Sequence, residues 1–400
     1  MLTPAEAEAL IGQHLQCLPI ESLPLAQCAG GVLRENIYAE RDQPPFDRVA
    51  MDGIALASHA VATGRRAFRV QATQAAGVAP LTLAAPDACI EVMTGAVLPA
   101  GCDSVVPVEE LTVAGGAAAL GADVRVAPWQ NVHRRGSDTR QGTLLVSAGT
   151  RLRAPEVAIA ASAGMARIRV SSQPMLAVVS TGNELVEPGE PVLAHQVRRS
   201  NAYAIVSALR EHGFQRVADE HLQDDAEELR ERLRFHLETH DVLVLSGGVS
   251  MGKFDLVPQV LTELGVPAIF HKVGQRPGKP LWFGVAPSGA AVFGLPGNPV
   301  STLVCLARYV LPALFASLGQ SAPPAERLAL GGPVSVNAPL THFLPVRIEQ
   351  DDWGRPWAMP APTNGSGDFT ALAGTDGFVE LPPGPNTYKK GFVTRLFRWS

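Results

Sequence analysis

The sequence has 400 residues, enough for two or three domains and for a hydrophobic core that folds without disulfide or metal staples. Hydrophobic residues make up 46% and charged residues 18%, which is typical of a globular protein and excludes a largely disordered one. Lysine and arginine number 33 against 38 aspartates and glutamates, so the net charge of −5 disfavours a nucleic-acid-binding protein.

The N-terminal third of the chain predicts a helix followed by a small β-rich domain. Thr3 can cap the helix, a proline follows at its first position, and Glu6 can reach back to the cap. Residues 46–139 alternate short β-branched runs with glycine, alanine and proline, which is typical of strands and turns. The flanking segments, 1–45 and 140–172, then form a connecting domain into which the β-rich domain is inserted.

Residues 173–320 alternate buried strands with helices, which predicts an α/β domain with a doubly wound, mostly parallel sheet. Ser200 or Asn201 is expected to cap one of the helices. The apolar stretch 300–318 contains a central arginine, so we expect a core helix and not a membrane span. After a proline-rich linker, residues 325–400 predict a small C-terminal β domain.

Cysteine use and the first residues bear on the cellular compartment. The five cysteines are odd in number and none is spaced C-x-x-C, so neither a disulfide framework nor a zinc-thiolate site is expected. The first residues lack the basic and apolar runs of a signal peptide. We therefore expect buried thiols in a protein of the reducing cytoplasm.

Ligands of an open parallel sheet bind beyond the carboxyl ends of its strands, and loop 245–255 follows such a strand. Its three glycines and two serines let backbone N–H groups approach an anion closely. Asp255 offers an oxygen ligand for Mg²⁺. Read alone, a Gly-Gly loop of this kind is more often a plain strand-to-helix turn.

A second loop of this kind, 293–301, leads into the core helix. Asn298 fits the cap and Pro299 the first helical position, which leaves the N–H groups of Val300 and Ser301 open to an anion. The prolines on their own would only stiffen the backbone.

A third loop, 272–280, places three cations within eight residues on a turn of restricted backbone freedom. The cations are Lys272, Arg276 and Lys279. A solvated basic loop is the plain reading, whereas its place after a strand of the same sheet favours a clamp for phosphate or another oxyanion.

Further short motifs of glycine, proline, acidic and hydroxyl residues occur along the chain. Each is individually more often a structural turn than a site, but their ordered set is specific. The set comprises PFD at 45–47, MDG at 51–53, MTGA at 93–96, GSD at 136–138, STGNEL at 180–185, SGGVS at 246–250, PGKP at 277–280, PGNPVS at 296–301 and GSG at 365–367.

This set resembles the molybdopterin molybdenumtransferase family, known as MoeA in bacteria and as the E-domain of gephyrin-type proteins. The resemblance covers nearly the whole chain. It implies an enzyme that inserts molybdate into adenylylated molybdopterin and releases AMP, with Mg²⁺ assisting. It also implies elongated homodimers of four-domain subunits, with dimerisation through the connecting domain and an α/β domain similar to the molybdopterin adenylyltransferase.

The same resemblance implies partners and site residues. The active site would lie between the α/β domain of one subunit and the β-rich domains of the other. The adenylyltransferase and apo-molybdoenzymes would be partners, with no nucleic acid and no membrane. The family's catalytic positions fall on Asp52, Thr94, Asp138, Glu184, Asp224 and Asp255, of which Asp255 and Glu184 would hold the magnesium. Its substrate-binding positions fall on Ser246, Gly247, Gly248, Ser250, Lys272, Arg276, Lys279, Pro296, Asn298, Pro299, Ser301, Arg347 and Ser366.

Three positions depart from the family pattern toward less negative charge. Ser137 stands in place of a frequent glutamate, Asn183 in place of a common aspartate, and Lys253 in place of an acidic residue. These changes leave the metal stoichiometry open and are compatible with a divergent paralogue. Separately, the sequence does not distinguish molybdate from tungstate as the anion. Two alternatives to the enzyme stay open at this point: a pterin-binding scaffold without turnover, and a nucleotide-pyrophosphate hydrolase.

Overall fold

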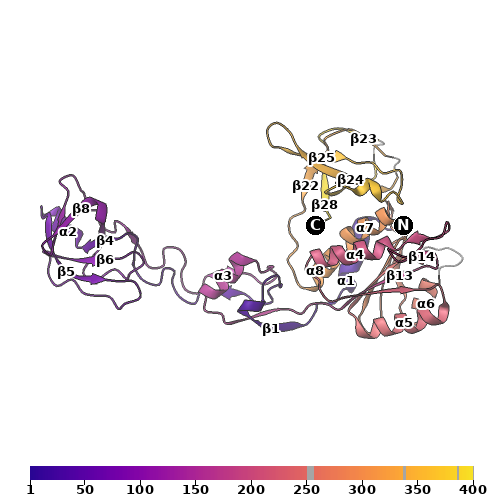
Figure 1. Ribbon diagram of the computed structural model, residues 1–400, viewed down its shortest axis with the longest axis horizontal. Coiled ribbons are helices and arrows are strands. Elements are labelled where there is room, and N and C mark those ends of the chain that lie inside the picture. The colour runs from indigo at the N-terminus through magenta and orange to yellow at the C-terminus, as the bar shows by residue number, and fades with distance from the viewer. Residues whose placement is uncertain (250–255, 337–338, 385–386, 400) are drawn as a thin grey trace.

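The computed structural model describes residues 1–249, 256–336, 339–384 and 387–399. The molecule is elongated (Figure 1), with the β-rich domain at one end and the α/β and C-terminal domains at the other. A small connecting domain lies between them. We call the β-rich domain the distal domain.

The first helix, α1 (Pro4–His14), forms the expected capping box, in which Thr3 and Glu6 hydrogen-bond to each other's backbone N–H groups. Its apolar face does not pack in the connecting domain with which we grouped it. Ala7 and Ile11 lie in the same core cluster as strands of the α/β domain. The helix therefore belongs structurally to the α/β domain.

The connecting domain consists of two short antiparallel strand pairs and one helix. Strand β1 (Ile20–Pro24) pairs with β12 (Arg167–Ser171), β2 (Ile37–Tyr38) pairs with β11 (Leu144–Val146), and α3 (Ala154–Ser162) packs beside them.

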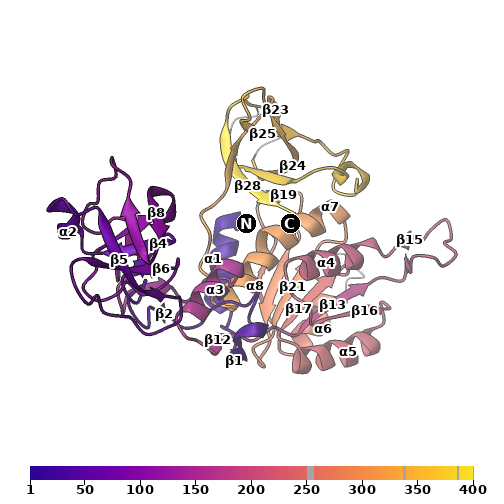
Figure 2. The same cartoon turned by 60° about the vertical axis from the view of Figure 1, so that its left-hand side comes forward.

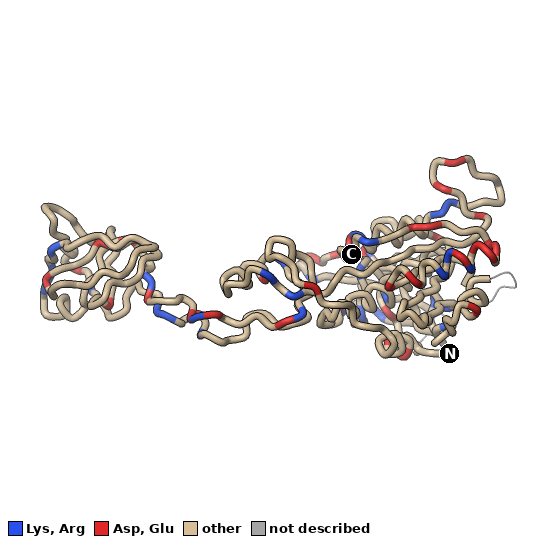
Figure 3. The backbone as a smooth tube through the Cα atoms, turned by 90° about the horizontal axis from the view of Figure 1, so that it is seen from below, with Lys and Arg blue, Asp and Glu red and all other residues tan. Residues whose placement is uncertain are grey.

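Two stretches of chain run from the connecting domain to the distal domain, and both carry charges of each sign (Figure 3). An ion pair joins them, with Nε of Arg135 2.9 Å from Oδ2 of Asp42. Short strands pair here as well, β3 (Arg48–Val49) with β10 (Val132–His133).

The distal domain is built on a six-stranded sheet with two small apolar clusters. Gly53 in its second strand is required by close packing, because a Cβ there would overlap the carbonyl oxygen of Val106 on the neighbouring strand. A short helix, α2 (Ser58–Ala62), covers one side. The strands in sheet order are β7 (Ser104–Pro107), β4 (Gly53–Leu56), β6 (Ala88–Val92), β5 (Ala67–Gln74), β9 (Ala117–Leu120) and β8 (Leu111–Ala114).

The α/β domain has the predicted doubly wound, mostly parallel sheet. Four strands are parallel, and two antiparallel strands complete one edge. The order is β16 (Val217–Leu222), β13 (Leu176–Thr181), β17 (Val242–Ser246), β21 (Ala291–Leu295), β20 (Trp282–Val285) and β18 (Ala268–His271).

Helices cover both faces of this sheet. One face carries α1, α4 (Ser200–Glu211) and the core helix, and the other carries α5 (Ala226–Thr239) and α6 (Val257–Glu263). The predicted cap of α4 is wrong, because Ser200 is already its first helical residue and Arg199 holds the cap position.

The core helix comprises α7 (Pro299–Cys305), a π-helical turn (Leu306–Val310) and α8 (Leu311–Ser317). By length and composition it could cross a membrane, but 78% of its most apolar window is buried inside the protein. It packs against the sheet and α4, so the expectation of a core helix is confirmed. All five cysteines are free thiols, and four are buried as expected, whereas Cys17 is exposed because it lies in the loop after α1.

The C-terminal domain stands over the core helix (Figure 2). Its sheet accepts one strand from the α/β domain: β19 (Gln275–Arg276) pairs in parallel with β24 (Thr341–Gln350). A segment of the α/β domain therefore forms the edge of the C-terminal sheet, which is separate from the α/β sheet. The remaining strands are β26 (Gly377–Leu381), β28 (Val393–Arg398), β22 (Arg327–Ala329) and β25 (Pro356–Pro360), with β23 (Val334–Ser335) and β27 (Thr387–Tyr388) as a separate pair.

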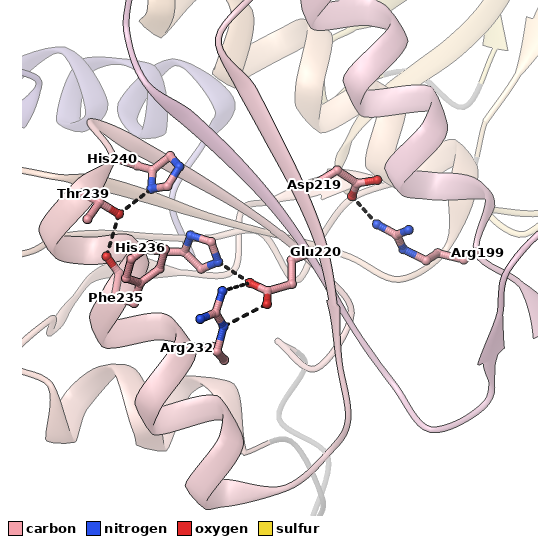
Figure 4. A network of polar contacts seen from close by, with 8 residues as sticks. All are labelled: Arg199, Asp219, Glu220, Arg232, Phe235, His236, Thr239 and His240. Carbon is pink, nitrogen blue, oxygen red and sulfur yellow. Dashed lines mark hydrogen bonds and ion pairs between the residues drawn. The ribbon is translucent and has the colours of Figure 1, made fainter.

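Edge strand β16 is fastened to the domain by two ionic contacts, shown in Figure 4. Arg232 on α5 forms two hydrogen bonds to the Glu220 carboxylate, at 2.8 and 3.1 Å, and buried His236 forms a third. On the adjacent residue of the strand, Asp219 pairs with the buried side chain of Arg199. These contacts anchor the edge strand to α5 and to the residue before α4.

We expect Glu220→Gln to weaken the fold at neutral pH but not in acid. Burial opposes ionisation of Glu220, yet the hydrogen bonds from Arg232 and His236 outweigh it and lower its pKa below the ordinary 4.5. A lowered pKa stabilises the folded state above pH 4.5, and that contribution is lost as the pH falls through the folded-state value. Denaturant midpoints of the variant should be lower than wild type at pH 7 and should converge below pH 4.5. Glu227→Gln, on an exposed i,i+3 pair of the same helix, is the control and should change little.

Candidate functional site

A cavity of about 710 Å³ lies between the α/β and C-terminal domains. The turn after β19, the start of α7 and loops of the C-terminal domain line it. Of its described lining residues, the charged ones are both cations, Arg276 and Lys279. Predicted residues that share this cavity are Arg276, Lys279, Pro296, Asn298, Ser301 and Ser366.

Pairing between the two domains fixes the cationic turn. Arg276 lies opposite His342 in the β19–β24 ladder, and the N–H of Thr341 donates to the carbonyl of Gly274 at 3.0 Å. His342 also lines the cavity, and burial followed by the charge of Arg276 lowers its pKa below the ordinary 6.5. The His342 side chain is therefore neutral at physiological pH, and the positive charge of the cavity comes from Arg276 and Lys279.

The start of α7 differs from the expected open anion site. Asn298 occupies the cap position, but its side-chain amide donates to Oγ of Ser366 at 2.9 Å instead of capping the helix. The N–H of Val300 donates to the carbonyl of Ser366 at 3.0 Å. The expectation that this N–H faces an anion is thus wrong, because a C-terminal loop occupies it. The same contacts bring Ser366 to the cavity.

The loop after β17 lies against the loop after β13. Gly247 and Gly248 both have positive φ, and a side chain on Gly248 would collide with Oγ1 of Thr181. That hydroxyl is buried and has no hydrogen-bond partner among the described residues. The glycines therefore let the two loops pack closely, and they enclose the Thr181 hydroxyl.

Asn201 joins two of these loops. Its amide donates to Oγ of Ser246 at 3.1 Å and to the carbonyl of Gly297 at 2.7 Å. Sequence analysis treated Asn201 only as a possible cap and missed this role. The sequence signal for this role was the run of polar residues at 199–201, which follows the short strand β15 (Val197–Arg198).

Acidic candidates cluster at the neighbouring strand ends. The carboxylate of Glu184 folds over Gly182, and the Asn183 side chain accepts a 2.9 Å hydrogen bond from the N–H of Asp224. Within the described part of the chain, the Glu184 carboxylate has neither an ion pair nor a hydrogen-bond partner. The predicted residues Ser250 and Asp255 lie outside the described residues.

Three predicted catalytic residues lie away from the cavity of their own chain. Asp52 and Thr94 are in the distal domain and Asp138 is near its junction with the connecting domain (Figure 1). Thr94 donates two hydrogen bonds to Oδ1 of Asp52, at 2.6 and 2.7 Å, and they lower the pKa of Asp52. Asp138 contacts His133 at 2.7 Å.

Three further predicted residues are not among those lining the cavity. Pro299 starts α7 behind Asn298. Lys272 has a left-handed φ of 78° in the turn before β19. Arg347 is exposed on β24 opposite Met359.

Comparison with known proteins decides the family. Residues 2–164 match the family described as "MoeA N-terminal region (domain I and II)", residues 177–316 "Probable molybdopterin binding domain", and residues 327–393 "MoeA C-terminal region (domain IV)". A molybdopterin molybdenumtransferase from Synechocystis sp. is 39% identical over 400 residues, the whole of both chains.

The chain belongs to the MoeA family. Two solved structures of the MoeA protein from Pyrococcus horikoshii agree with its fold, each with a TM-score of 0.83. They are 29% and 25% identical and match all of this chain and 99% or 100% of their own. The Bacillus subtilis molybdopterin molybdenumtransferase is 29% identical over 91% of this chain and 86% of its own. This MoeA protein is accordingly a transferase of molybdenum cofactor biosynthesis.

Proposed function

We propose that this MoeA protein inserts molybdate into adenylylated molybdopterin, releases AMP, and binds the molybdate in the cavity between the α/β and C-terminal domains. Molybdate is a tetrahedral dianion, so it needs fixed cations and hydrogen-bond donors. The single observation that carries the proposal is the cavity lining. Arg276 and Lys279 are its charged members among the described residues, and Ser301 and Ser366 add hydroxyls.

The pterin nucleotide would bind beside this cavity, along the loops after β13 and β17. Gly247 and Gly248 have no side chains and adopt positive φ, so the backbone N–H groups of this loop can approach a phosphate closely. Asn201 keeps Ser246 next to the α7 loop, so nucleotide and molybdate would occupy adjoining positions.

A magnesium ion is compatible with Glu184, whose carboxylate is uncommitted within the described residues. In that part of the chain no three His, Cys, Asp or Glu side chains converge on one point. Mg²⁺ commonly takes one or two carboxylates and completes its shell with phosphates and waters, which suits this arrangement. When bound, it would offset charge on the phosphoryl oxygens. Asp255 stays the sequence-based candidate for a second ligand.

The distal residues call for a second subunit. Asp52, Thr94 and Asp138 lie far along an elongated chain from its own cavity (Figure 1), so they would act only in a homodimer that brings the distal domain of one copy to the cavity of the other. The same proposal includes a cytoplasmic location. It also includes the molybdopterin adenylyltransferase and apo-molybdoenzymes as partners. The hydrolase alternative leaves the matched N- and C-terminal domains without a role. The scaffold alternative is distinguished by turnover.

We expect two inactive variants to restore each other. Asp52→Asn keeps the acceptor for Thr94, and Lys279→Ala removes a cavity cation. Differently tagged copies of these variants are co-expressed in cells lacking their own transferase, and the mixed dimers are purified through both tags. Each mixed dimer contains one intact site of two, so AMP release should reach about half of the wild-type rate.

Each variant alone, purified as a homodimer and assayed at the same limiting molybdate concentration, is the control and should be nearly inactive. Mixed dimers as inactive as the controls would contradict the shared site. A wild-type protein that binds both substrates yet forms neither AMP nor molybdenum cofactor would establish the scaffold instead.

A further inference from the structure

A buried amide spans the cationic turn of the cavity. The side chain of Gln275 is 0% exposed, and its nitrogen donates to the carbonyl of Gly278 at 3.2 Å and contacts Sγ of Cys305 at 3.5 Å. Its oxygen accepts a hydrogen bond from the hydroxyl of buried Tyr309. All hydrogen-bonding groups of the amide are therefore used, and it ties both ends of the turn to the core helix.

The π-helical turn directs the Tyr309 side chain toward Gln275. Tyr309 and Arg308 are adjacent in the turn but reach different elements. Tyr309 meets Gln275, whereas Arg308 pairs with Glu8 on α1 at 2.8 Å and lies 3.4 Å from Glu380 on β26. A π turn inserts one residue into the helical repeat and so changes the direction of the side chains that follow, which is why such turns recur at functional sites.

The backbone of the turn is fitted to this amide. Gly278 has φ of +90°, and a Cβ there would come within 2.6 Å of both Cys305 Sγ and Gln275 Nε2. Arg276 follows Gln275 directly and Lys279 follows Gly278 directly. Holding residues 275 and 278 thus sets the two positions from which the cations extend into the cavity.

We propose that Tyr309 and Gln275 are positioning residues that hold Arg276 and Lys279 in place for the oxyanion before it binds. This inference rests on the proposed molybdate site. Neither residue needs to touch the anion, because a preorganised pair of cations binds without first ordering its loop. Loss of the Tyr309 hydroxyl leaves a buried oxygen of Gln275 unsatisfied, and the turn must move or admit water to repair it.

Tyr309→Phe tests the proposal through the separation of KM from kcat. We expect the KM for molybdate to rise about fivefold to tenfold, the effect of one lost hydrogen bond. The kcat and the KM for adenylylated molybdopterin should stay within about twofold. Ser317→Ala removes a buried hydroxyl-to-carbonyl bond further along the same helix and is the matched control, with an unchanged molybdate KM.

Gln275→Met provides a second, independent variant and should raise the molybdate KM in the same way. In Tyr309→Phe/Gln275→Met the two effects should fall short of additive, because both remove one contact. A molybdate KM unchanged in both single variants, or full additivity in the double variant, would overturn the positioning role. If Lys279→Ala also left the molybdate KM unchanged, the fault would lie with the cavity assignment itself.

Discussion

Replacing Lys279 with alanine is expected to lower the rate of molybdate transfer at limiting molybdate by about 100-fold, the effect of losing a charge-assisted contact of about 3 kcal/mol. The residue is one of two cations among the described residues that line the cavity. The cavity walls are otherwise neutral, since the lowered pKa of His342 prevents it from replacing the lost charge near pH 7. AMP release followed over a molybdate titration measures the effect.

The exposed Lys389 provides a matched control, because Lys389→Ala removes the same charge from a turn that does not line the cavity. Its transfer rate should stay within about twofold of wild type. Lys279→Arg keeps the charge and should recover part of the activity. Equal rates for Lys279→Ala and Lys389→Ala would remove the cavity from the mechanism.

Replacing Glu8 with glutamine is expected to lower the free energy of unfolding by about 3 kcal/mol, because the buried guanidinium of Arg308 loses its nearer carboxylate. The Arg308 side chain is 1% exposed and pairs with Glu8, 2.8 Å away on the N-terminal helix. Its Nε lies 3.4 Å from Glu380 of the C-terminal domain, near enough for attraction but not aligned as a hydrogen bond. Three parts of the chain thus meet on one guanidinium.

Urea denaturation followed by tryptophan fluorescence measures this change. The control is Glu326→Gln, which removes an ion pair of similar length to Arg398 at a half-exposed position. Exposed pairs contribute about 0–1 kcal/mol, so the control should barely move the midpoint. If the two variants unfolded at the same urea concentration, the buried pair would have no special part in joining the domains.

Local signals in the sequence were sufficient for much of the fold. The capping box of Thr3 and Glu6 depends on residues within one turn, and it is present. The start of α4 was misjudged because Arg199 is held from outside the helix, by Ser180, Glu187 and Asp219. Such contacts join residues that are distant in sequence, so no local pattern reveals them.

The same division applies to the candidate site. Arg276 and Lys279 were predicted because three cations and two prolines stand out in a short loop. Gln275, His342 and Tyr309 were missed, since their roles arise only when β19 joins the sheet of another domain and a π turn directs the tyrosine. Sequence analysis thus found the residues with charge and missed those that hold them.

The strand pairing of β19 with β24 has a consequence for how ligands enter and leave. If the C-terminal domain opened like a hinged flap, it would move away from the cations of the cavity. Arg276, however, is part of strand β19, which is paired to the sheet of that domain. The turn is also tied to the core helix through Gln275 and Tyr309, so rotation of the C-terminal domain would have to break the β19–β24 pairing. Any opening of the cavity by movement of the C-terminal domain would therefore have to separate backbone hydrogen bonds directly beside Arg276.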